Sequence, residues 1–254
     1  MITITEIKKE LMPRLSSLSV MNQLVQTIYV DSNPAQIEYI EVNKSESGES
    51  QAIKVSKQVK LKKHKLIVKS MGDLMMIISD EVNSPTITGN KLVCECISQR
   101  LNHDFLDTIT SDLKVENWTF FNQGIIRRLF HKRRNLDLIN KIFQTAFDSN
   151  WIIISNSTYS ILSKSTLFKE NSNKSDSIIK NVGQLNLDQL SINVYLNTEL
   201  VDDVIYFGRY DSVSIVVNKN LVVDELKSTR DRKTISVEVE YQFIVNRPIK
   251  CLYL

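Results

Sequence analysis

The histidines and cysteines of this chain are its first candidates for catalysis or metal binding. His103 and Asp107 lie four residues apart, a spacing that puts both side chains on one face of a helix. Such a pair could transfer protons or bind a metal, although an ion pair on a helix surface is the commoner arrangement. Cys94 and Cys96 are predicted to point to different faces, and Cys251 stands alone. Because no C-x-x-C spacing occurs, we expect neither a metal site nor redox chemistry.

The motifs of the commonest catalytic mechanisms are absent from the sequence. It contains no G-x-S-x-G nucleophile motif, no H-E-x-x-H zinc motif and no glycine-rich phosphate-binding turn. The whole chain of 254 residues has 6 glycines, which leaves little material for loops that wrap closely around phosphates. We therefore predict that the protein is not an enzyme and needs no cofactor.

Basic side chains are concentrated in two segments. The first comprises Lys57, Lys60, Lys62, Lys63, His64 and Lys65, and the second comprises Arg127, Arg128, His131, Lys132, Arg133 and Arg134. Either segment could contact nucleic-acid phosphates, and the arginines and lysine of the second could instead pair with carboxylates of a neighbouring subunit. Both could equally be solvated surfaces, since edge strands often carry lysines and the net charge is only +3.

The element around which the others are organised is predicted at residues 233–245, which read KTISVEVEYQFIV. Apolar and polar residues alternate strictly there, so a long strand with one buried face is expected. The buried face comprises Ile235, Val237, Val239, Tyr241, Phe243 and Val245. Asn246-Arg247-Pro248 should end the strand, because proline cannot donate a ladder hydrogen bond.

A long helix at about 88–110 is the predicted cover for this strand. Thr88 or Asn90 is its expected N-cap, and its apolar residues recur at spacings of three and four. They are Leu92, Val93, Ile97, Leu101, Phe105 and Ile109. A second long helix is predicted over 125–147, with an apolar stripe of Ile139, Ile142, Phe143, Ala146 and Phe147.

A long, largely polar hairpin is predicted at residues 36–67, with Gly48 at its tip. One arm reads QIEYIEVN and the other AIKVSKQVKLKKHKLIV. A two-stranded ribbon is marginally stable alone, so we expect it to rest on something outside its own fold. Its predicted subunit contacts are Lys44, Glu46, Glu49, Lys54, Lys57 and Lys60.

The remaining segments are expected to be shorter. Residues 2–30 read as an arm rather than a core element, and residues 70–80 as a short helix. A buried strand is predicted at Trp151–Ile154, followed by a helix capped by Ser157. Residues 169–182 read as a surface loop, and residues 224–232 as a charged crossing segment before the last strand. Three further strands are expected at INVYL, VIYF and 213–217. The alternation of strands with helices in the middle of the chain suggests a mixed α/β sheet there.

The order of these segments resembles the coat protein fold of tailed double-stranded DNA phages, named after phage Hong Kong 97. The resemblance is carried by SNWIIISNSTYSILSKS, INVYLNTELVDDVIYFGRYDSVSIVV and DELKSTRDRKTISVEVEYQFIVNRP. It implies an α+β fold with a hairpin, the extended loop, that reaches over a neighbouring subunit. The implied domains are an N-terminal arm at 1–34, the extended loop at 35–68, a peripheral domain at 69–117 and 224–254, and an axial α/β domain at 118–223.

The function that this resemblance implies is that of a major capsid protein. Such a protein assembles into pentamers and hexamers in an icosahedral virion, formed in the host cytoplasm around double-stranded DNA that it contacts non-specifically. The chain lacks a long N-terminal helical region, so scaffolding is expected from a separate protein, with a portal protein as a further partner. The alternatives are a scaffolding segment that is cut off before the start of this chain, or no scaffold at all. An encapsulin-type nanocompartment shell, a minor or vertex capsid protein and a basic nucleic-acid-binding module are the alternatives. No apolar run approaches about 18 residues, so no membrane partner is expected.

Overall fold

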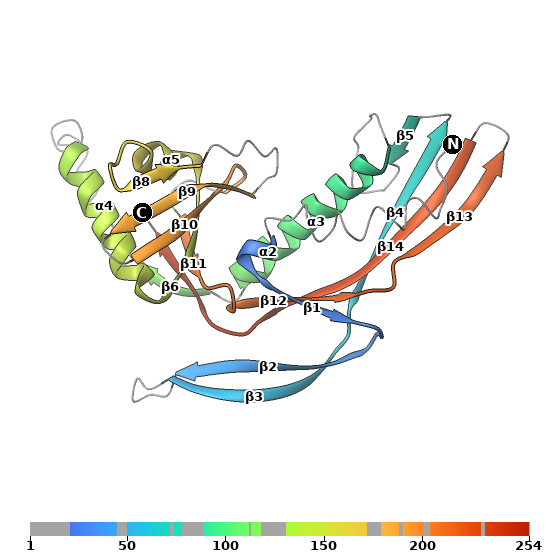
Figure 1. The fold of residues 1–254 in the computed structure, drawn as a ribbon, viewed down its shortest axis with the longest axis horizontal. Helices are drawn as coiled ribbons and strands as arrows, with labels where there is room; N and C mark the ends of the chain where they lie inside the picture. The colour runs from blue at the N-terminus through green and yellow to red at the C-terminus, as the bar shows by residue number, and fades with distance from the viewer. Residues whose placement is uncertain are drawn as a thin grey trace. The chain divides into compact units, whose positions relative to one another are not determined.

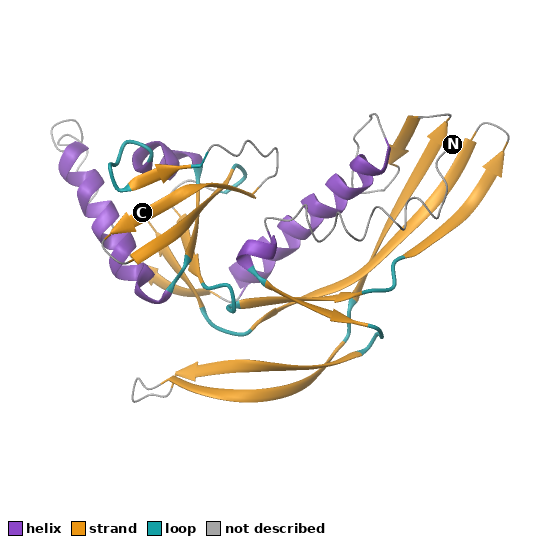
Figure 2. Ribbon diagram, viewed as in Figure 1, coloured by secondary structure: helices purple, strands orange, loops and turns teal. Residues whose placement is uncertain are grey.

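The computed structural model describes residues 21–44, 50–71, 74–77, 89–111, 113–117, 131–171, 179–187, 190–200, 204–229 and 232–253. The chain divides into two compact units. The first comprises residues 1–105 and 214–246, and the second comprises residues 106–213 and 247–254. Figure 1 gives the labels of the elements, and Figure 2 shows that strands dominate the described residues. None of the described helices combines the length and apolar character that a membrane-crossing helix requires.

The first unit is built on a six-stranded sheet with the order β1-β12-β14-β4-β5, to which β13 adds by pairing with β14. These strands are β1 (Gln26–Val30), β4 (Lys62–Met71), β5 (Leu74–Ile77), β12 (Val213–Asn218), β13 (Val222–Thr229) and β14 (Arg232–Val245). The short helix α2 (Met21–Leu24) directly precedes β1 in the chain. The long helix α3 (Gly89–Ser111) lies along one face of the sheet (Figure 1). The strand predicted at 233–245 is therefore confirmed as the central strand β14.

The face of β14 that meets α3 is the predicted apolar one. Ile235, Val237, Val239, Tyr241 and Phe243 are all buried, and the Phe105 and Phe243 rings lie 5.9 Å apart between centroids. The helix contributes Val93, Ile97, Leu101 and Phe105, which are all buried and which recur every four residues. Ile109, the next residue at this spacing, is also buried and belongs to the second unit. Strict alternation on the strand and a four-residue spacing on the helix thus predicted this packing. Val245 is only partly buried, and the side chain of Leu92 and the cap residue Thr88 are outside the described residues.

Three expectations for the first unit were wrong. The segment 2–30, expected to be an arm rather than a core element, is described from residue 21, and that part belongs to the core: β1 pairs in parallel with β12, and Leu24 and Val25 are fully buried. The segment from Leu74 is a strand, β5, that pairs with β4, and the two residues between these strands are Gly-Asp, a short-turn signal. Residues 224–229 belong to β13, which pairs with β14 from Val222 to Thr229. An edge strand with both faces largely exposed lacks the alternation that reveals a strand.

The second unit contains a seven-stranded sheet with the order β6-β15-β11-β7-β10-β9-β8. Its strands are β6 (Leu113–Asn117), β7 (Trp151–Ile154), β8 (Phe168–Glu170), β9 (Ile179–Leu187), β10 (Leu190–Asn197), β11 (Val204–Gly208) and β15 (Ile249–Tyr253). The pairs β10/β7 and β15/β6 are parallel and the others are antiparallel, so the predicted mixed sheet is confirmed.

Helices α4 (His131–Thr145) and α5 (Asn156–Leu162) complete the core of the second unit, together with the 3₁₀ turn η2 (Ala146–Asp148). The cluster between helices and sheet includes Leu138, Ile139, Ile142 and Phe143, and the whole of β7 is buried. Phe147 was predicted in the same stripe but is 85% exposed. The α-helix ends at Thr145, and after that point a spacing of four no longer returns a side chain to the same face.

Three further details of the second unit differ from expectation. The N-cap of α5 is Ser155 rather than Ser157, and its side chain accepts a hydrogen bond from the Thr158 backbone at 3.4 Å. The segment predicted as a loop at 169–182 contains the end of β8 and the start of β9. Strands β6 and β15 were assigned to the domain of the long strand, but both lie in this sheet because β15 pairs with β11 and β6. The other domain boundaries stay predictions.

Candidate functional site: the extended hairpin and its root

The extended hairpin consists of β2 (Ala35–Lys44) and β3 (Ser50–Val59), which form a separate two-stranded sheet (Figure 1). Their antiparallel register runs without interruption from Ala35↔Val59 to Lys44↔Ser50. The hairpin is thus confirmed, but its second arm is shorter than predicted. After Leu61 the chain enters β4, whose residues pair with β14 instead of β2.

The two faces of the hairpin differ in chemistry. Opposed residues of an antiparallel pair share a face, so Ile37, Tyr39, Val55 and Ile53 form an apolar stripe along one side, on which Lys57 lies opposite Ile37 and Glu41 lies opposite Ile53. Its exposure rises along the ribbon, from 3% for Ile37 through partly buried Tyr39 and Val55 to 43% for Ile53. The apolar face is therefore covered near the sheet and open farther out.

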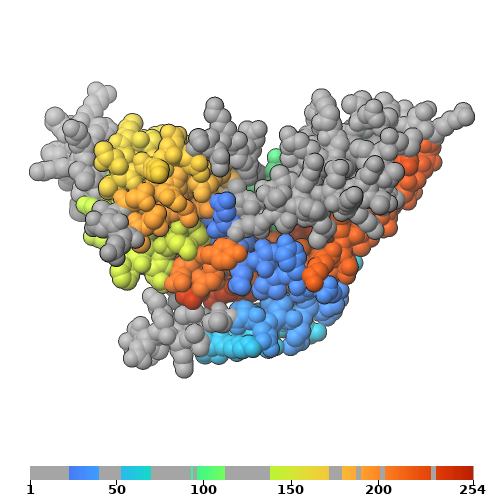
Figure 3. Space-filling model, in the orientation of Figure 1, coloured from blue at the N-terminus to red at the C-terminus, as the bar shows by residue number. Residues whose placement is uncertain are grey.

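The inner end of the hairpin, which we call the root, is covered by the chain's own sheet. A buried cluster joins Ala35, Ile37, Val59 and Leu61 to Val216 of β12 and Ile244 of β14. Ile28 and Val30 of β1 pack against the same cluster, and in Figure 3 the atoms of β1 and β2 form one continuous blue surface. The hairpin was expected to rest on something outside its fold, and for its inner half that support is this sheet.

A polar cluster lies beside this apolar one at the root. Asn33 and Leu61 exchange two hydrogen bonds: Asn33 Nδ2 donates to the Leu61 carbonyl at 3.1 Å, and the Leu61 amide donates to Asn33 Oδ1 at 3.0 Å. Glu240 of β14 is 9% exposed and accepts a hydrogen bond from Asn218 Nδ2 at 2.8 Å. Lys63 Nζ lies 3.2 Å from Glu240 Oε1 and 3.1 Å from Glu238 Oε1.

The charge state of Glu240 follows from these contacts. Burial by itself opposes ionisation, but hydrogen bonds from Asn218 and Asn33, together with the Lys63 ammonium, outweigh it and lower the pKa of the Glu240 carboxyl. The same carboxylates raise the pKa of Lys63 through hydrogen bonds with Glu238 and Glu240. At neutral pH the root therefore holds an ionised carboxylate with donors from β12, β4 and the residues preceding β2.

The charged residues predicted as hairpin contacts are only partly described. Lys54 forms an ion pair with Glu38 across the polar face, and both side chains are more than half exposed, so the pair adds little stability. Lys57 and Lys60 are exposed. Glu46, Glu49 and the side chain of Lys44 lie outside the described residues. Whether any of these residues contacts another subunit stays a prediction.

The second basic segment cannot be placed from the described side chains. Arg127 and Arg128 precede the described part of the helix, and the backbone of α4 is described from His131. The structure does not describe the side chains of Lys132, Arg133 and Arg134 either. Their contact with DNA or with a neighbouring subunit stays a prediction.

The histidine and cysteine candidates do not assemble into a metal site within the described residues. No group of three or more His, Cys, Asp or Glu side chains there could hold a metal ion. His64 stacks on Tyr241 with ring centroids 4.1 Å apart, and Tyr241 Oη donates a hydrogen bond to Asp104 Oδ2 at 2.7 Å. Burial, with help from this hydrogen bond, raises the pKa of Tyr241. This arrangement ties α3 to β14 and β4.

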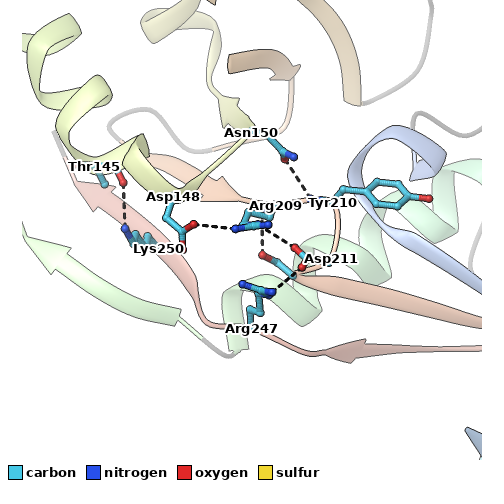
Figure 4. A network of polar contacts seen from close by, with 9 residues as sticks. Thr145, Asp148, Asn150, Arg209, Tyr210, Asp211, Arg247 and Lys250 are labelled. Atoms are coloured by element: carbon cyan, nitrogen blue, oxygen red, sulfur yellow. Dashed lines mark hydrogen bonds and ion pairs between the residues drawn. The ribbon is translucent and has the colours of Figure 1, made fainter. Parts of the chain in front are cut away.

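A second polar network lies in the second unit, at the turn after β11 (Figure 4). Arg209 donates from Nη1 to Asp148 Oδ1 at 2.9 Å and from Nε to Asp211 Oδ1 at 3.1 Å. Arg247 Nη2 lies 2.9 Å from Asp211 Oδ2, and Lys250 Nζ donates to the Thr145 carbonyl at 3.2 Å. The network joins three segments that are distant in sequence and fixes the turn that carries Tyr210, which is 44% exposed.

Sequence reasoning missed the polar residues of the root. Asn33-Pro34 is a turn signal, which indicates a boundary but not a hydrogen-bonded side chain. Glu240 was assigned to the solvent side of β14 by alternation, and that assignment of side is consistent with its neighbours Lys63 and Glu238. Asn218, which donates a hydrogen bond to Glu240, and Asn33, which helps to lower its pKa, are distant in sequence, so no local pattern could reveal these contacts.

Comparison with solved structures identifies the fold. A virus-like particle from Pyrococcus furiosus superposes with a TM-score of 0.57 and 14% identity, covering 98% of both chains. The capsid of a native GTA particle gives a TM-score of 0.55 at 10% identity, covering 95% of this chain and 90% of that one. An encapsulin from Synechococcus elongatus gives 0.51 at 12% identity, with 96% and 88% covered. The chain therefore has the Hong Kong 97-type capsid fold, as the order of its segments predicted.

Comparison at the level of sequence finds no relative of this chain. No family model matches the chain, and no curated protein matches it either. The chain thus shares its backbone arrangement with these three structures at identities between 10% and 14%.

Proposed function

We propose that this chain is a structural subunit that assembles with copies of itself into a closed shell. The observation that carries the proposal is the Hong Kong 97-type fold, which extends over 98% of the chain in the comparison with a virus-like particle. The hairpin supports it, because its apolar stripe is covered at the root and open at Ile53. A ribbon of two strands is suited to pack that open part on a neighbouring subunit. The role proposed is structural and not catalytic.

In the particular form that we favour, the shell is the icosahedral capsid of a tailed phage. The chain would form pentamers and hexamers, in the host cytoplasm, around double-stranded DNA that it contacts without sequence preference. A separate scaffolding protein and a portal protein would be its partners. The resemblance of the last strands to phage coat proteins supports this form, and a minor or vertex-restricted capsid subunit is its variant.

A nanocompartment shell is the second candidate, and the similarity to an encapsulin favours it. The two forms differ in content: a capsid encloses nucleic acid, whereas a nanocompartment encloses a protein cargo. Absorbance at 260 and 280 nm and protein electrophoresis of purified particles separate them directly. A third, different class is a nucleic-acid-binding module that uses Arg127, Arg128, Lys132, Arg133 and Arg134, and it predicts a monomer or dimer that binds DNA in a salt-sensitive manner.

The test of the shell proposal is assembly of the purified chain, with and without its hairpin tip. Size-exclusion chromatography with light scattering and negative-stain microscopy should show closed shells or rings for the wild type, given a scaffolding protein if one is required. Deletion of residues 44–51 should leave the circular dichroism spectrum unchanged and abolish assembly. A deletion that unfolds the chain would show that the hairpin tip is part of the core and would contradict its proposed role.

Two adjacent residues on opposite faces of the hairpin provide a matched comparison. Ile53→Ser removes an apolar side chain from the open part of the stripe, whereas Lys54→Ser changes the polar face. We expect Ile53→Ser to weaken assembly more than Lys54→Ser, at equal thermal stability. Equal assembly of both variants would argue against contact through the apolar face. A chain that stays monomeric with phage scaffolding protein, and that binds DNA stoichiometrically, would favour the nucleic-acid-binding module.

A further inference from the structure

The hydrogen bonds between Asn33 and Leu61 continue the ladder of the hairpin beyond its last backbone pair. The paired residues of β2 and β3 have Ala35↔Val59 as the innermost pair, and the next equivalent pair in this register is Asn33 with Leu61. Pro34, which lies between, has no N–H to donate. The side-chain amide of Asn33 supplies both a donor and an acceptor to the Leu61 backbone, at 3.1 and 3.0 Å. A side chain thus takes the place of a backbone rung.

The root also meets the long sheet at Glu240 of β14. Asn218 Nδ2, at the end of β12, donates a hydrogen bond to Glu240 at 2.8 Å, and Lys63, at the start of β4 and two residues after Leu61, lies 3.2 Å from the same carboxylate. The amide of Asn33 is among the groups that favour the ionised form of this carboxylate. Loss of any one of these donors would leave a buried carboxylate oxygen with one hydrogen bond fewer, which costs free energy. Glu240 is therefore the point at which the hairpin root, β12, β4 and β14 meet.

We propose that Asn33 and Glu240 are positioning residues that hold the extended hairpin in a fixed direction relative to the long sheet before any neighbour binds. The apolar cluster beneath the root favours contact but is not directional, whereas hydrogen bonds restrict angle as well as distance. Bending of the hairpin is then confined to its outer part, beyond Tyr39 and Val55. The inference concerns the single chain and holds whether or not the proposed shell forms.

The charges around Glu240 determine how this anchor responds to pH. On β4 the nearby cations are Lys63 and, opposite Glu238 in the register, Lys65, and on β14 the nearby anion is Glu238. The exposed pair Asp31–Lys219 lies in the segments that lead to and from the root. Because the pKa of Glu240 is lowered on folding, the stabilisation is present at neutral pH and is lost as the pH falls through that lowered pKa. The anchor should therefore stay closed at neutral pH and open only in acid, as the pH falls below the ordinary pKa range of a carboxyl group.

Hydrogen exchange of the full-length chain, followed by mass spectrometry, tests the proposal. Peptides covering β2 and β3 are compared between wild type, Asn33→Ala and Glu240→Gln in the same oligomeric state. We expect exchange of amides near the root, including that of Leu61, to be at least about fivefold faster in both variants at pH 7, since each loses hydrogen bonds worth about 1 kcal/mol or more. Amides of β7 in the second unit should not change.

The pH profile separates positioning from general stabilisation. After correction for intrinsic rates, protection of the root should fall in acid in the wild type, whereas in Glu240→Gln it should be low at every pH. A matched control, Asn220→Ala, removes an exposed amide that donates to the Asp31 carbonyl and not to Glu240. It should behave as the wild type.

Unchanged root protection in Asn33→Ala would overturn the proposal, as would a wild-type acid response in Glu240→Gln. If Glu240→Gln unfolds, which loss of β7 protection would reveal, Asn33→Ala decides alone. In that case, faster exchange of Asn33→Ala that is confined to the hairpin root supports the proposed anchor. Root exchange in Asn33→Ala equal to that in Asn220→Ala refutes it.

Discussion

Two phenylalanines four residues apart give a direct test of where α4 ends. Phe143 lies in the buried cluster of the second unit and is 7% exposed, whereas Phe147 is 85% exposed. Between them the α-helix gives way to the 3₁₀ turn η2, which is closed by a hydrogen bond from the Ser149 amide to the Ala146 carbonyl at 2.8 Å. The same substitution at the two positions should therefore have very different effects.

The expected size of each effect follows from burial. Replacing a buried phenylalanine by alanine costs about 3–5 kcal/mol, whereas a substitution at an exposed site usually changes stability by less than about 0.5 kcal/mol. With a urea m-value of about 2 kcal/mol per M, Phe143→Ala should lower the unfolding midpoint by about 1.5–2.5 M, and Phe147→Ala by less than about 0.3 M. Fluorescence of Trp151, which is buried in the same unit, reports the transition.

A milder pair keeps the test usable if Phe143→Ala does not fold. Phe143→Leu and Phe147→Leu should differ in the same direction, with a cost of about 1 kcal/mol at the buried position. Equal destabilisation at both positions would refute the reasoning, because it would mean that α4 continues as a regular helix and that Phe147 packs in the core.

Two further predictions concern the sheet of the second unit. Gly208 lies opposite Trp151 in the register of β11 and β7, and a Cβ atom there would overlap the indole ring. Gly208→Ala should therefore lower the free energy of unfolding by about 1–3 kcal/mol, while Thr198→Ala on an exposed turn should not, in parallel thermal melts. Burial raises the pKa of Cys251 to about 11 and the pKa of Tyr206, whose neighbours include Cys251 and Tyr253, to about 12. The folded state thus favours their neutral forms, so stability should decline as the pH rises from about 9 toward 12. The decline in urea midpoint should be shallower in Tyr206→Phe, and an equal slope would contradict this assignment.

Local sequence patterns determined the elements whose side chains meet one continuous core. The alternation in β14, the four-residue spacing in α3 and the apolar run Trp151–Ile154 were each sufficient, because burial on one face imposes a period on the sequence. The chain order of these elements also indicated the Hong Kong 97-type fold, which the comparisons with solved structures bear out.

Tertiary structure alone decided which distant segments pair and which polar groups become buried. The edge strands β1 and β13 carry little alternation, so their places beside β12 and β14 depend on partners far away in the chain. Glu240 looks like an ordinary solvent-facing residue of a strand until Asn33 and Asn218 are brought to it. Local periodicity records which side of an element is apolar, whereas the pairing of edges and the satisfaction of buried charges depend on contacts between residues distant in sequence. For that reason the core of this protein could be predicted, and the root of its hairpin could not.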